Sequence, residues 1–471
     1  MMALAFLRRG EVVYVEQFEP DTMLLDYLRL TEKSRGTKEG CNEGDCGSCT
    51  VVLGDVHEGR MRYKAVNACI LFLGQIHGKE LITVEDLSHG GRLHAVQQAM
   101  VDFHASQCGF CSPGFVMSLF ALGHEKQVVT RDDVVTAVAG NLCRCTGYRP
   151  IIDAGLKACA ALEDQFTADA AHSIAALATI DDGDFASGNA QHFFYSPATA
   201  KSLAEQVAKQ PQARVISGAT DVGLWVTKQL KDQKQIIYTG RARDFAEVRN
   251  TEAGLHIGAG ATYTDAMAAL TKHAPDVGAV MHRLGSVQVR NMGTIGGNIA
   301  NGSPIGDMPP MLIALGTTLT LRFGESERHM PLEDFFIDYG KQDRTAGELV
   351  WAIDVPVLSP SQHFKAYKIS KRFDQDISAA LGAFLFRLEG DVISEIRIAF
   401  GGMAATPKRA RQTEAALKGR TLQQALEIKL DDFTPLSDMR ASAHYRSELA
   451  QGLLTKALME VQGAGQTRIA L

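Results

Sequence analysis

The sequence predicts a multidomain α+β protein, and three observations lead to this fold class. The chain has 471 residues, which is too many for one ordinary hydrophobic core. All nine cysteines lie between Cys41 and Cys159, so the first third of the chain differs in kind from the rest. Beyond residue 190, apolar strand-like runs alternate with helical segments, and glycine-rich loops connect them.

The composition excludes several classes of protein. Hydrophobic residues make up 45% and charged residues 22%, as in water-soluble globular proteins. The net charge of −6 argues against a nucleic-acid or anionic-membrane binder, because such proteins carry a basic surplus. No apolar run approaches the roughly 18 residues that span a bilayer, and the N-terminal arginines are misplaced for a signal peptide. We therefore expect a cytoplasmic protein.

The first cysteine group has the spacing C-x4-C-x2-C at Cys41, Cys46 and Cys49, and Cys69 follows at a distance. Plant-type [2Fe–2S] centres use this spacing, with four thiolates on two irons. Strands predicted over 3–7 and 11–18, then a short helix over 22–30, indicate a small β-rich domain. Zinc is the alternative, but zinc sites usually combine two C-x2-C knuckles and this group has one.

The second group consists of a C-x2-C pair, Cys108 and Cys111, and a C-x-C pair, Cys143 and Cys145. Four helices are predicted around these pairs: 94–104, one with Ser112 as N-cap, one from the Thr130 cap to Gly140, and 150–162. In isolation the set could bind zinc, but its position after a plant-type motif favours a second [2Fe–2S] cluster. Cys159 lies among alanines on the last helix, which is typical of a buried apolar position.

Two glycine-rich loops in the second half have the composition of phosphate-binding segments. One is the stretch 215–221, after a predicted strand, and the other is 293–301, which continues to Asp307. Bare backbone N–H groups and short hydroxyls can approach a pyrophosphate closely, so two such loops favour a dinucleotide cofactor. A third loop, 258–262, lacks the last glycine of a Rossmann fingerprint and is not interpreted as one.

Three segments identify a family resemblance: KEGCNEGDCGSCTVVL, QCGFCSPGFVMSL and GNLCRCTGYRPI. They resemble the iron–sulfur module of the molybdenum hydroxylases, the family of xanthine dehydrogenase and aldehyde oxidase. The resemblance implies that Cys41, Cys46, Cys49 and Cys69 hold the cluster nearer the flavin. It implies that Cys108, Cys111, Cys143 and Cys145 hold the cluster nearer the molybdenum centre, and that Gln107 lies close to the molybdopterin of a partner subunit.

The glycine-rich loops resemble the FAD-binding segments of the same family. The resemblance implies a set of flavin-contacting residues: Val215, Ile216, Ser217, Gly218, Ala219, Thr220, Asp221, Val222, Leu284, Thr294, Ile295, Gly296, Gly297, Asn298, Asp307, Val350 and Lys368. Leu284 stands where several relatives have a phenylalanine against the flavin, so aromatic stacking is lost there. The polar segment 370–378 is implied to form a wall of the flavin and NAD⁺ site, with Asp374 and Asp376 influencing which acceptor approaches.

The family's architecture implies four domains and a linker. These are a plant-ferredoxin-like β-grasp domain over 1–82, a four-helix [2Fe–2S] bundle over 83–162, and a linker over 163–190. A vanillyl-alcohol-oxidase-type FAD domain follows over 191–357. A C-terminal α+β domain like that of the CO dehydrogenase flavoprotein occupies 358–471 and includes a helix predicted over 441–462.

The segments SKRFDQDISA and FTPLSDMRASAHYR resemble the small subunits of two-subunit bacterial xanthine dehydrogenases. The expected function is therefore electron transfer from a molybdopterin-binding large subunit, which converts hypoxanthine to xanthine and urate, through both clusters to FAD and NAD⁺. Nothing in the chain resembles the molybdopterin-binding region, and a dimer of heterodimers is the family expectation. The alternatives are a subunit acting with an aldehyde or N-heterocycle hydroxylase, and a zinc-binding redox scaffold without flavin.

Overall fold

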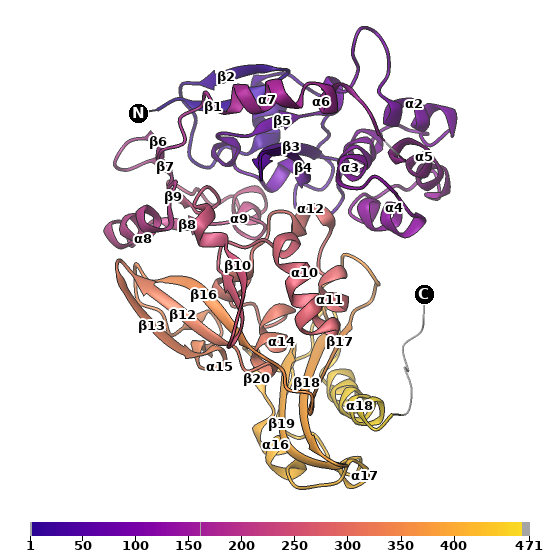
Figure 1. Cartoon of the computed structure of the whole chain (residues 1–471), viewed down its shortest axis with the longest axis vertical. Helices are drawn as coiled ribbons and strands as arrows, with labels where there is room; N and C mark the ends of the chain where they lie inside the picture. The colour runs from indigo at the N-terminus through magenta and orange to yellow at the C-terminus, as the bar shows by residue number, and fades with distance from the viewer. Residues whose placement is uncertain (1, 161, 464–471) are drawn as a thin grey trace. The chain divides into compact units, whose positions relative to one another are not determined.

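The computed structural model of the chain describes residues 2–160 and 162–463 (Figure 1). The chain divides into two compact units, and each combines sheets with helices as the predicted α+β class requires. Unit one contains the chain up to Arg243 together with the short segment Gly285–Gly293. Unit two contains Asp244–Leu284 and the chain from Thr294 onward.

Unit one begins with a five-stranded β-grasp sheet of order β2-β1-β5-β3-β4. The two predicted N-terminal strands are confirmed as an antiparallel hairpin, and β1 pairs in parallel with β5. Leu24, Leu25 and Leu28, which share one face of the predicted short helix, are buried in the core of this domain. The elements are β1 Leu4–Arg8, β2 Glu11–Val15, α1 Leu24–Asp26, η1 Tyr27–Thr31, β3 Thr50–His57, β4 Arg60–Asn67, η2 Ala68–Ile70, η3 Leu73–Ile76, β5 Glu80–Ile82 and η4 Val84–Asp86.

A buried carboxyl group on β5 makes the stability of unit one depend on pH. Burial raises the pKa of Glu80 to about 7, and the hydroxyl of Ser173 and the charge of His172 oppose this only in part. The unfolded chain has a value of about 4.3, so the folded state binds the proton more tightly and stability falls as pH rises from there to about 7.

Glu80→Gln removes this titration, so we expect the gain in stability to be about 2–3 kcal/mol larger near pH 8 than near pH 5. Thermal unfolding of the variant and wild type at both pH values measures the difference. Glu11→Gln, at an exposed position of β2, is the control and should leave both values unchanged. An equal effect of Glu80→Gln at the two pH values would contradict the assignment.

Four helices follow the β-grasp sheet, as predicted. The central helix α3 is buried along most of its length and packs on α2, α4 and α5. Thr130 caps α4 as expected, whereas the N-cap of α3 is Cys111 rather than the predicted Ser112. The helix therefore begins at Ser112, one residue earlier than expected. The bounds are α2 Ala95–Asp102, α3 Ser112–Glu125, α4 Arg131–Val138 and α5 Arg149–Cys159.

The predicted linker, residues 163–190, is more structured than its composition indicated. It forms α6 Gln165–Ala168, α7 Ala170–Leu177 and strand β6 Phe185–Gly188. Leu177 and Ile180 pack against Ala5 and Leu7 of β1. The buried carboxylate of Asp164 accepts hydrogen bonds from His94 at 2.8 Å and His124 at 3.0 Å, which fixes the start of the segment to the helical bundle.

The rest of unit one is a second sheet of order β6-β7-β9-β8, in which β7, β9 and β8 are parallel. The segment Gly285–Gly293 joins this unit through the short helix α12, which packs on β4 and α4. The remaining elements are β7 Phe193–Ser196, α8 Ala200–Lys209, β8 Arg214–Ile216, α9 Val222–Thr227, β9 Gln235–Tyr238 and α12 Val287–Arg290.

Unit two contains an antiparallel sheet of order β10-β11-β16-β12-β13 with helices α10 and α13 in contact with it. Its elements are η5 Arg243–Ala246 at the boundary, β10 Val248–Thr251, β11 Gly254–Gly258, α10 Tyr263–His273, α11 Pro275–His282, α13 Ile295–Asn301, α14 Met308–Ala314, β12 Thr318–Phe323, β13 Ser326–Pro331, α15 Leu332–Phe335, β14 Phe336–Asp338, β15 Lys341–Gln342 and β16 Leu349–Pro356.

A second sheet of unit two, of order β17-β18-β19-β20, packs against the C-terminal helix α18 (Figure 1). Phe384, Phe400 and Leu454 are among the fully buried side chains of this core. The predicted C-terminal helix is confirmed as α18, and Gly463 follows it with a positive φ of 93°. The elements are β17 Gln362–Ile369, β18 Ala380–Glu389, β19 Val392–Gly401, β20 Lys408–Arg409, α16 Arg411–Leu417, α17 Leu422–Ala425 and α18 Ala443–Val461.

Candidate cofactor sites

The first cysteine group lies in the loop before β3 and in the following short helix η2. Cys41, Cys46 and Cys49 come from the loop, and Cys69 comes from η2. The thiol of Cys41 is hydrogen-bonded to those of Cys46 and Cys69, and Cys69 also contacts Cys49. The structure therefore brings all four predicted ligands together in a chain of thiol contacts.

The loop has the backbone that a cluster requires. Asn42, Gly44 and Gly47 have positive φ values of 57°, 82° and 66°, which turn the chain around the thiols. The N–H of Cys46 donates to the sulfur of Cys41 at 3.3 Å, the kind of contact that stabilises a cluster sulfur. A Cβ atom at Gly40 would lie 2.8 Å from the Cys46 sulfur, so a side chain there would occupy space beside the ligand.

Thiol contacts also shift the acidity of this group. Hydrogen bonds from Cys46 and Cys69 lower the pKa of Cys41 far below its ordinary value. The same contacts, with burial, raise the pKa of Cys46 and Cys69.

The second group is assembled in two turns of the helical bundle, as predicted. Cys111 contacts Cys143, and Cys108 contacts Cys145. The N–H of Cys143 donates to the Tyr148 hydroxyl at 2.9 Å. Burial raises the pKa of Cys111 to about 12. Cys108 and Cys145 are exposed to solvent, so this site opens on the surface of unit one.

The remaining cysteine, Cys159, is not part of either site. Its side chain is fully buried on α5 and its thiol donates to the Leu119 carbonyl at 3.2 Å. Burial raises the pKa of Cys159 to about 12. The prediction of a buried apolar position is confirmed.

The thiols of the second site are arranged in two pairs. Across residues 2–160 and 162–463, no three His, Cys, Asp or Glu side chains surround one metal-ion position. A structural zinc ion needs four ligands around one point, whereas a [2Fe–2S] cluster needs two thiolates at each of two irons. The pairs Cys108–Cys145 and Cys111–Cys143 fit the second requirement.

The first glycine-rich loop connects β8 to α9 in unit one. Val215 and Ile216 end the strand, Asp221 is the N-cap of α9, and Val222 begins the helix. Ala219 has a left-handed backbone with φ 57°. Among the described residues, the N–H groups of Gly218, Ala219 and Thr220 have no acceptor. These three donors are what an anionic group such as a pyrophosphate can bind.

Close packing fixes the shape of this loop. A Cβ atom at Gly218 would lie 1.9 Å from the carbonyl oxygen of Met292, so only glycine fits there. The side chain of Ser217 shares a hydrogen bond of 2.6 Å with Thr239. The Ser217 carbonyl accepts from Gln75 at 3.0 Å, which joins the loop to the β-grasp domain.

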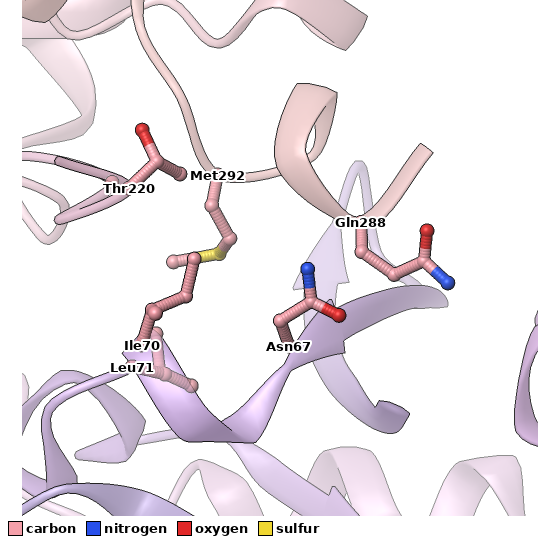
Figure 2. A pocket seen from close by; sticks show the side chains of 7 residues that line it. Asn67, Ile70, Leu71, Thr220, Gln288 and Met292 are labelled. Atoms are coloured by element: carbon pink, nitrogen blue, oxygen red, sulfur yellow. The ribbon is translucent and has the colours of Figure 1, made fainter. Parts of the chain in front are cut away.

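A small pocket lies between the Cys69 segment and this loop. Asn67, Ile70, Leu71, Gly218, Thr220, Gln288 and Met292 line it. Figure 2 shows the side chain of Met292 pointing toward Ile70. Thr220 lies near the backbone end of Met292, away from Ile70. The residue after a cluster ligand and the proposed flavin loop therefore share one cavity within unit one.

The second glycine-rich loop, in unit two, differs from the first in its hydrogen bonding. Thr294 caps α13 and accepts from the Gly297 N–H at 3.0 Å. The N–H groups of Ile295 and Gly296 donate to Ala261 and Ala259 of the third glycine-rich loop, both at 3.0 Å. The N–H groups of Ile295, Gly296 and Gly297 in this loop are therefore already bonded within the chain.

One polar atom of the second loop lacks a partner. The side-chain oxygen of Asn298 is buried and accepts no hydrogen bond from the described residues. Buried polar atoms are rarely left unbonded, so this oxygen is available to a donor group of a ligand such as a flavin nucleotide. This unpaired oxygen of Asn298 is the feature of unit two that fits a bound cofactor.

Asp307 and Lys368, both predicted at the flavin, form a buried ion pair in unit two. The Lys368 ammonium lies 2.5 Å from one oxygen of Asp307, and the Ser378 hydroxyl donates to the other at 2.5 Å. The side chains are only 2% and 7% exposed. Val350, on β16, and Leu284 are buried as well.

The polar segment 370–378 contains one ordered carboxylate. Burial opposes ionisation of Asp376, but the Arg372 and Ile377 N–H groups and the charge of Arg372 lower its pKa overall. Phe373 lies under the guanidinium of Arg283 at 4.5 Å and remains about half exposed. The charged turn is therefore folded on itself, while an aromatic ring faces solvent.

Sequence reasoning missed a lysine at the first cysteine group. Lys228, which follows α9, donates to the Cys41 carbonyl and lies 3.6 Å from Glu43. A positive charge at this place favours the reduced, more negative state of a cluster. No motif marks the position, because the contact joins residues 187 apart in sequence.

Four family models match successive parts of the chain. They are described as "2Fe-2S iron-sulfur cluster binding domain" over residues 9–73, "[2Fe-2S] binding domain" over 83–156, "FAD binding domain in molybdopterin dehydrogenase" over 186–358, and "CO dehydrogenase flavoprotein C-terminal domain" over 365–461. Xanthine dehydrogenase of Emericella nidulans is 30% identical over 95% of this chain. The chain belongs to the molybdenum hydroxylase family.

Other family members match at a similar level. Human aldehyde oxidase is 30% identical and matches 90% of this chain and 36% of its own length. The xanthine dehydrogenase is matched over 38% of its length, so the chain spans about two fifths of these curated relatives. The chain thus contains two [2Fe–2S] binding domains and an FAD-binding domain of the family.

Solved structures share the fold at lower identity. A Cu,Mo-CO dehydrogenase chain matches 58% of this chain and 98% of its own, with a TM-score of 0.53 and 24% identity. A chain of quinoline 2-oxidoreductase from Pseudomonas putida 86 matches 59% and 99%, with a TM-score of 0.53 and 22% identity. None of the helices in the described ranges has the length and apolar character that crossing a bilayer requires.

Proposed function

We propose that this chain transfers electrons between a molybdenum hydroxylase centre and a soluble acceptor. The single observation that carries the proposal is the assembly of eight cysteines into two groups of four, while the ninth is buried elsewhere. We assign one [2Fe–2S] cluster to Cys41, Cys46, Cys49 and Cys69, and the other to Cys108, Cys111, Cys143 and Cys145. FAD is assigned to the loop residues, Leu284, Asp307, Val350 and Lys368 given above.

The bound groups would supply one-electron transfer at the clusters and exchange between one- and two-electron transfer at the flavin. The chain's own part is to hold eight thiolates in one loop, the short helix η2 and two turns of the helical bundle. It also offers three bare N–H donors at Gly218, Ala219 and Thr220. The proposed domain boundaries are those expected from the sequence.

The exposed second cysteine site suits a contact with the electron donor. Phe110 and Leu142, next to its cysteines, are 45% and 44% exposed, and Gln107 is exposed beside Cys108. Large apolar side chains that cluster on a surface are typical of protein interfaces. We assign this face to a molybdopterin-binding large subunit, within a cytoplasmic dimer of heterodimers.

The proposed substrate is hypoxanthine or xanthine, and the proposed acceptor is NAD⁺. The resemblance of residues 370–379 and 433–446 to bacterial xanthine dehydrogenase small subunits supports this choice. Matches to xanthine dehydrogenase and aldehyde oxidase at the same 30% identity keep an aldehyde-oxidising complex as the second candidate. The complex purified through a tag on this chain should reduce NAD⁺ with xanthine and not with aldehydes. The reverse result would favour the second candidate.

A glycine substitution tests the flavin loop. Gly218→Ala places a methyl group against the Met292 carbonyl, so the loop must move and its N–H donors lose their arrangement. We expect FAD content after purification to fall at least tenfold, a loss of about 1.4 kcal/mol or more in binding, with iron content unchanged.

Gly452→Ala is the matched control for this variant. A Cβ atom at Gly452, in α18, meets nothing within 4 Å, so the variant should keep its FAD and be slightly more stable. Full FAD content in Gly218→Ala would show that the loop does not bind the cofactor.

A further inference from the structure

The two cysteine sites of unit one are joined by direct backbone contacts. The N–H of Leu142 donates to the Cys46 carbonyl at 3.0 Å. Leu142 precedes Cys143, so one hydrogen bond connects a ligand of the first proposed cluster to the residue beside a ligand of the second. This is a short, mostly covalent path between the two groups.

Three glycines allow this approach. A Cβ atom at Gly47 would lie 2.3 Å from the Gly140 carbonyl oxygen, and one at Gly114 would lie 2.1 Å from that of Gly47. A Cβ atom at Gly140 would lie 2.2 Å from the side-chain oxygen of Gln288. The backbone around Gly47 therefore packs closely against Gly114 and Gly140, and the side chain of Gln288 packs against Gly140.

Buried side chains hold these closely packed loops. Asn141 donates to the Gly47 carbonyl at 3.0 Å, and Ser118 donates to the Asn141 side-chain oxygen at 2.7 Å. The amide of Gln288 lies within 3.1 to 3.3 Å of Ser118, Thr50 and Asn141. We call Thr50, Ser118, Asn141 and Gln288 the junction network. Each member is at most 3% exposed.

Gln288 bonds to the other three members of the network, as Asn141 does. Its donor to Asn141 helps to orient that amide, so that the Asn141 N–H groups face Gly47. Its side-chain oxygen has no hydrogen-bond partner among the described residues. Figure 2 shows its amide directed away from Thr220 and Met292, while the side chain also forms part of the lining of the pocket beside the flavin loop. The residue therefore acts on the junction between the cysteine loops.

We infer that Gln288 is a positioning residue for electron transfer between the two clusters, an inference that rests on the proposed function. Gln288 fixes Asn141, and Asn141 fixes the loop whose Leu142 N–H bonds to Cys46. With both clusters bound, one electron would pass from the reduced cluster of the exposed site to the oxidised cluster of the first site, without transfer of a proton. Unlike the other members, Gln288 comes from the segment Gly285–Gly293, which is surrounded in sequence by unit two.

The test uses the complete chain carrying both clusters and FAD. Gln288→Leu keeps the size of the side chain and removes its donors, and Ser118→Ala removes a second member if the first variant folds poorly. One-electron pulse reduction measures how fast the electron redistributes between the clusters, and low-temperature electron paramagnetic resonance of the fully reduced chain measures their magnetic coupling. We expect redistribution to slow severalfold and the resolved coupling to broaden, with both cluster signals at full intensity.

Asn291→Ala is the matched control. Asn291 lies in the same segment, and its side chain donates to the Ala65 carbonyl of β4 at 2.9 Å. It should keep the wild-type rate and coupling. Wild-type behaviour of both Gln288→Leu and Ser118→Ala would overturn the inference. Absence of cluster signals from the wild-type chain would instead overturn the proposed function.

Discussion

Replacing Cys143 with alanine is expected to remove one of two clusters and leave the rest of the chain loaded. Wild-type protein should contain about four irons per chain, two for each cluster, and Cys143→Ala about two. The thiol pair Cys111–Cys143 is broken, whereas the first site keeps all four cysteines. Iron analysis and electron paramagnetic resonance of the reduced protein measure the loss.

Cys159→Ala is the control for this experiment. Cys159 is fully buried and its thiol is hydrogen-bonded to the Leu119 carbonyl. Its replacement should therefore lower the stability of the fold and leave the iron content unchanged. FAD content should be unchanged in both variants. Four irons retained in Cys143→Ala, or two lost in Cys159→Ala, would contradict the assignment of ligands.

The second large effect is expected at the ion pair in unit two. Lys368→Met leaves the Asp307 carboxylate buried beside Ser378 without its cation. Loss of one partner of a buried pair typically costs about 3–5 kcal/mol, because the remaining charge is uncompensated. Lys368→Met together with Asp307→Leu should cost much less than the two single changes added together.

Denaturant unfolding followed by tryptophan fluorescence measures these values. The chain has two tryptophans, and in a Trp225→Phe background Trp351 of β16 reports on unit two alone. Arg387→Met is the control, because the Arg387–Glu395 pair is 42% and 59% exposed and should contribute less than about 1 kcal/mol. Additive effects at Asp307 and Lys368 would show that the two side chains do not act as a pair.

The local patterns of the sequence predicted much of the fold and the grouping of the cysteines. The ligand groups and the Thr130 cap depend on residues close together in sequence, so spacing and residue type were sufficient. The linker was harder to predict, since its alanines show no clear periodicity. Leu177 and Ile180 are ordered there by packing on β1, which lies far away in sequence.

The flavin loops show where composition stops being informative. Both loops combine glycine with short polar side chains, yet among the described residues it is Gly218, Ala219 and Thr220 of the first loop that keep three successive unbonded N–H groups. In the second loop, Ile295 and Gly296 donate to residues of the loop 258–262. The junction network likewise depends on contacts between residues far apart in sequence, because Gln288 bonds to Thr50 across 238 residues. Contacts of this range leave no local pattern to find.

Anaerobic reductive titration of the purified chain, followed by visible absorption, tests the central claim most directly. Two [2Fe–2S] clusters take one electron each and FAD takes two, so the chain should accept about four electrons, with iron–sulfur and flavin bands bleaching together. An endpoint near four electrons is the predicted result. A chain that accepts two or fewer electrons, or shows no visible bands and contains zinc, would contradict the account.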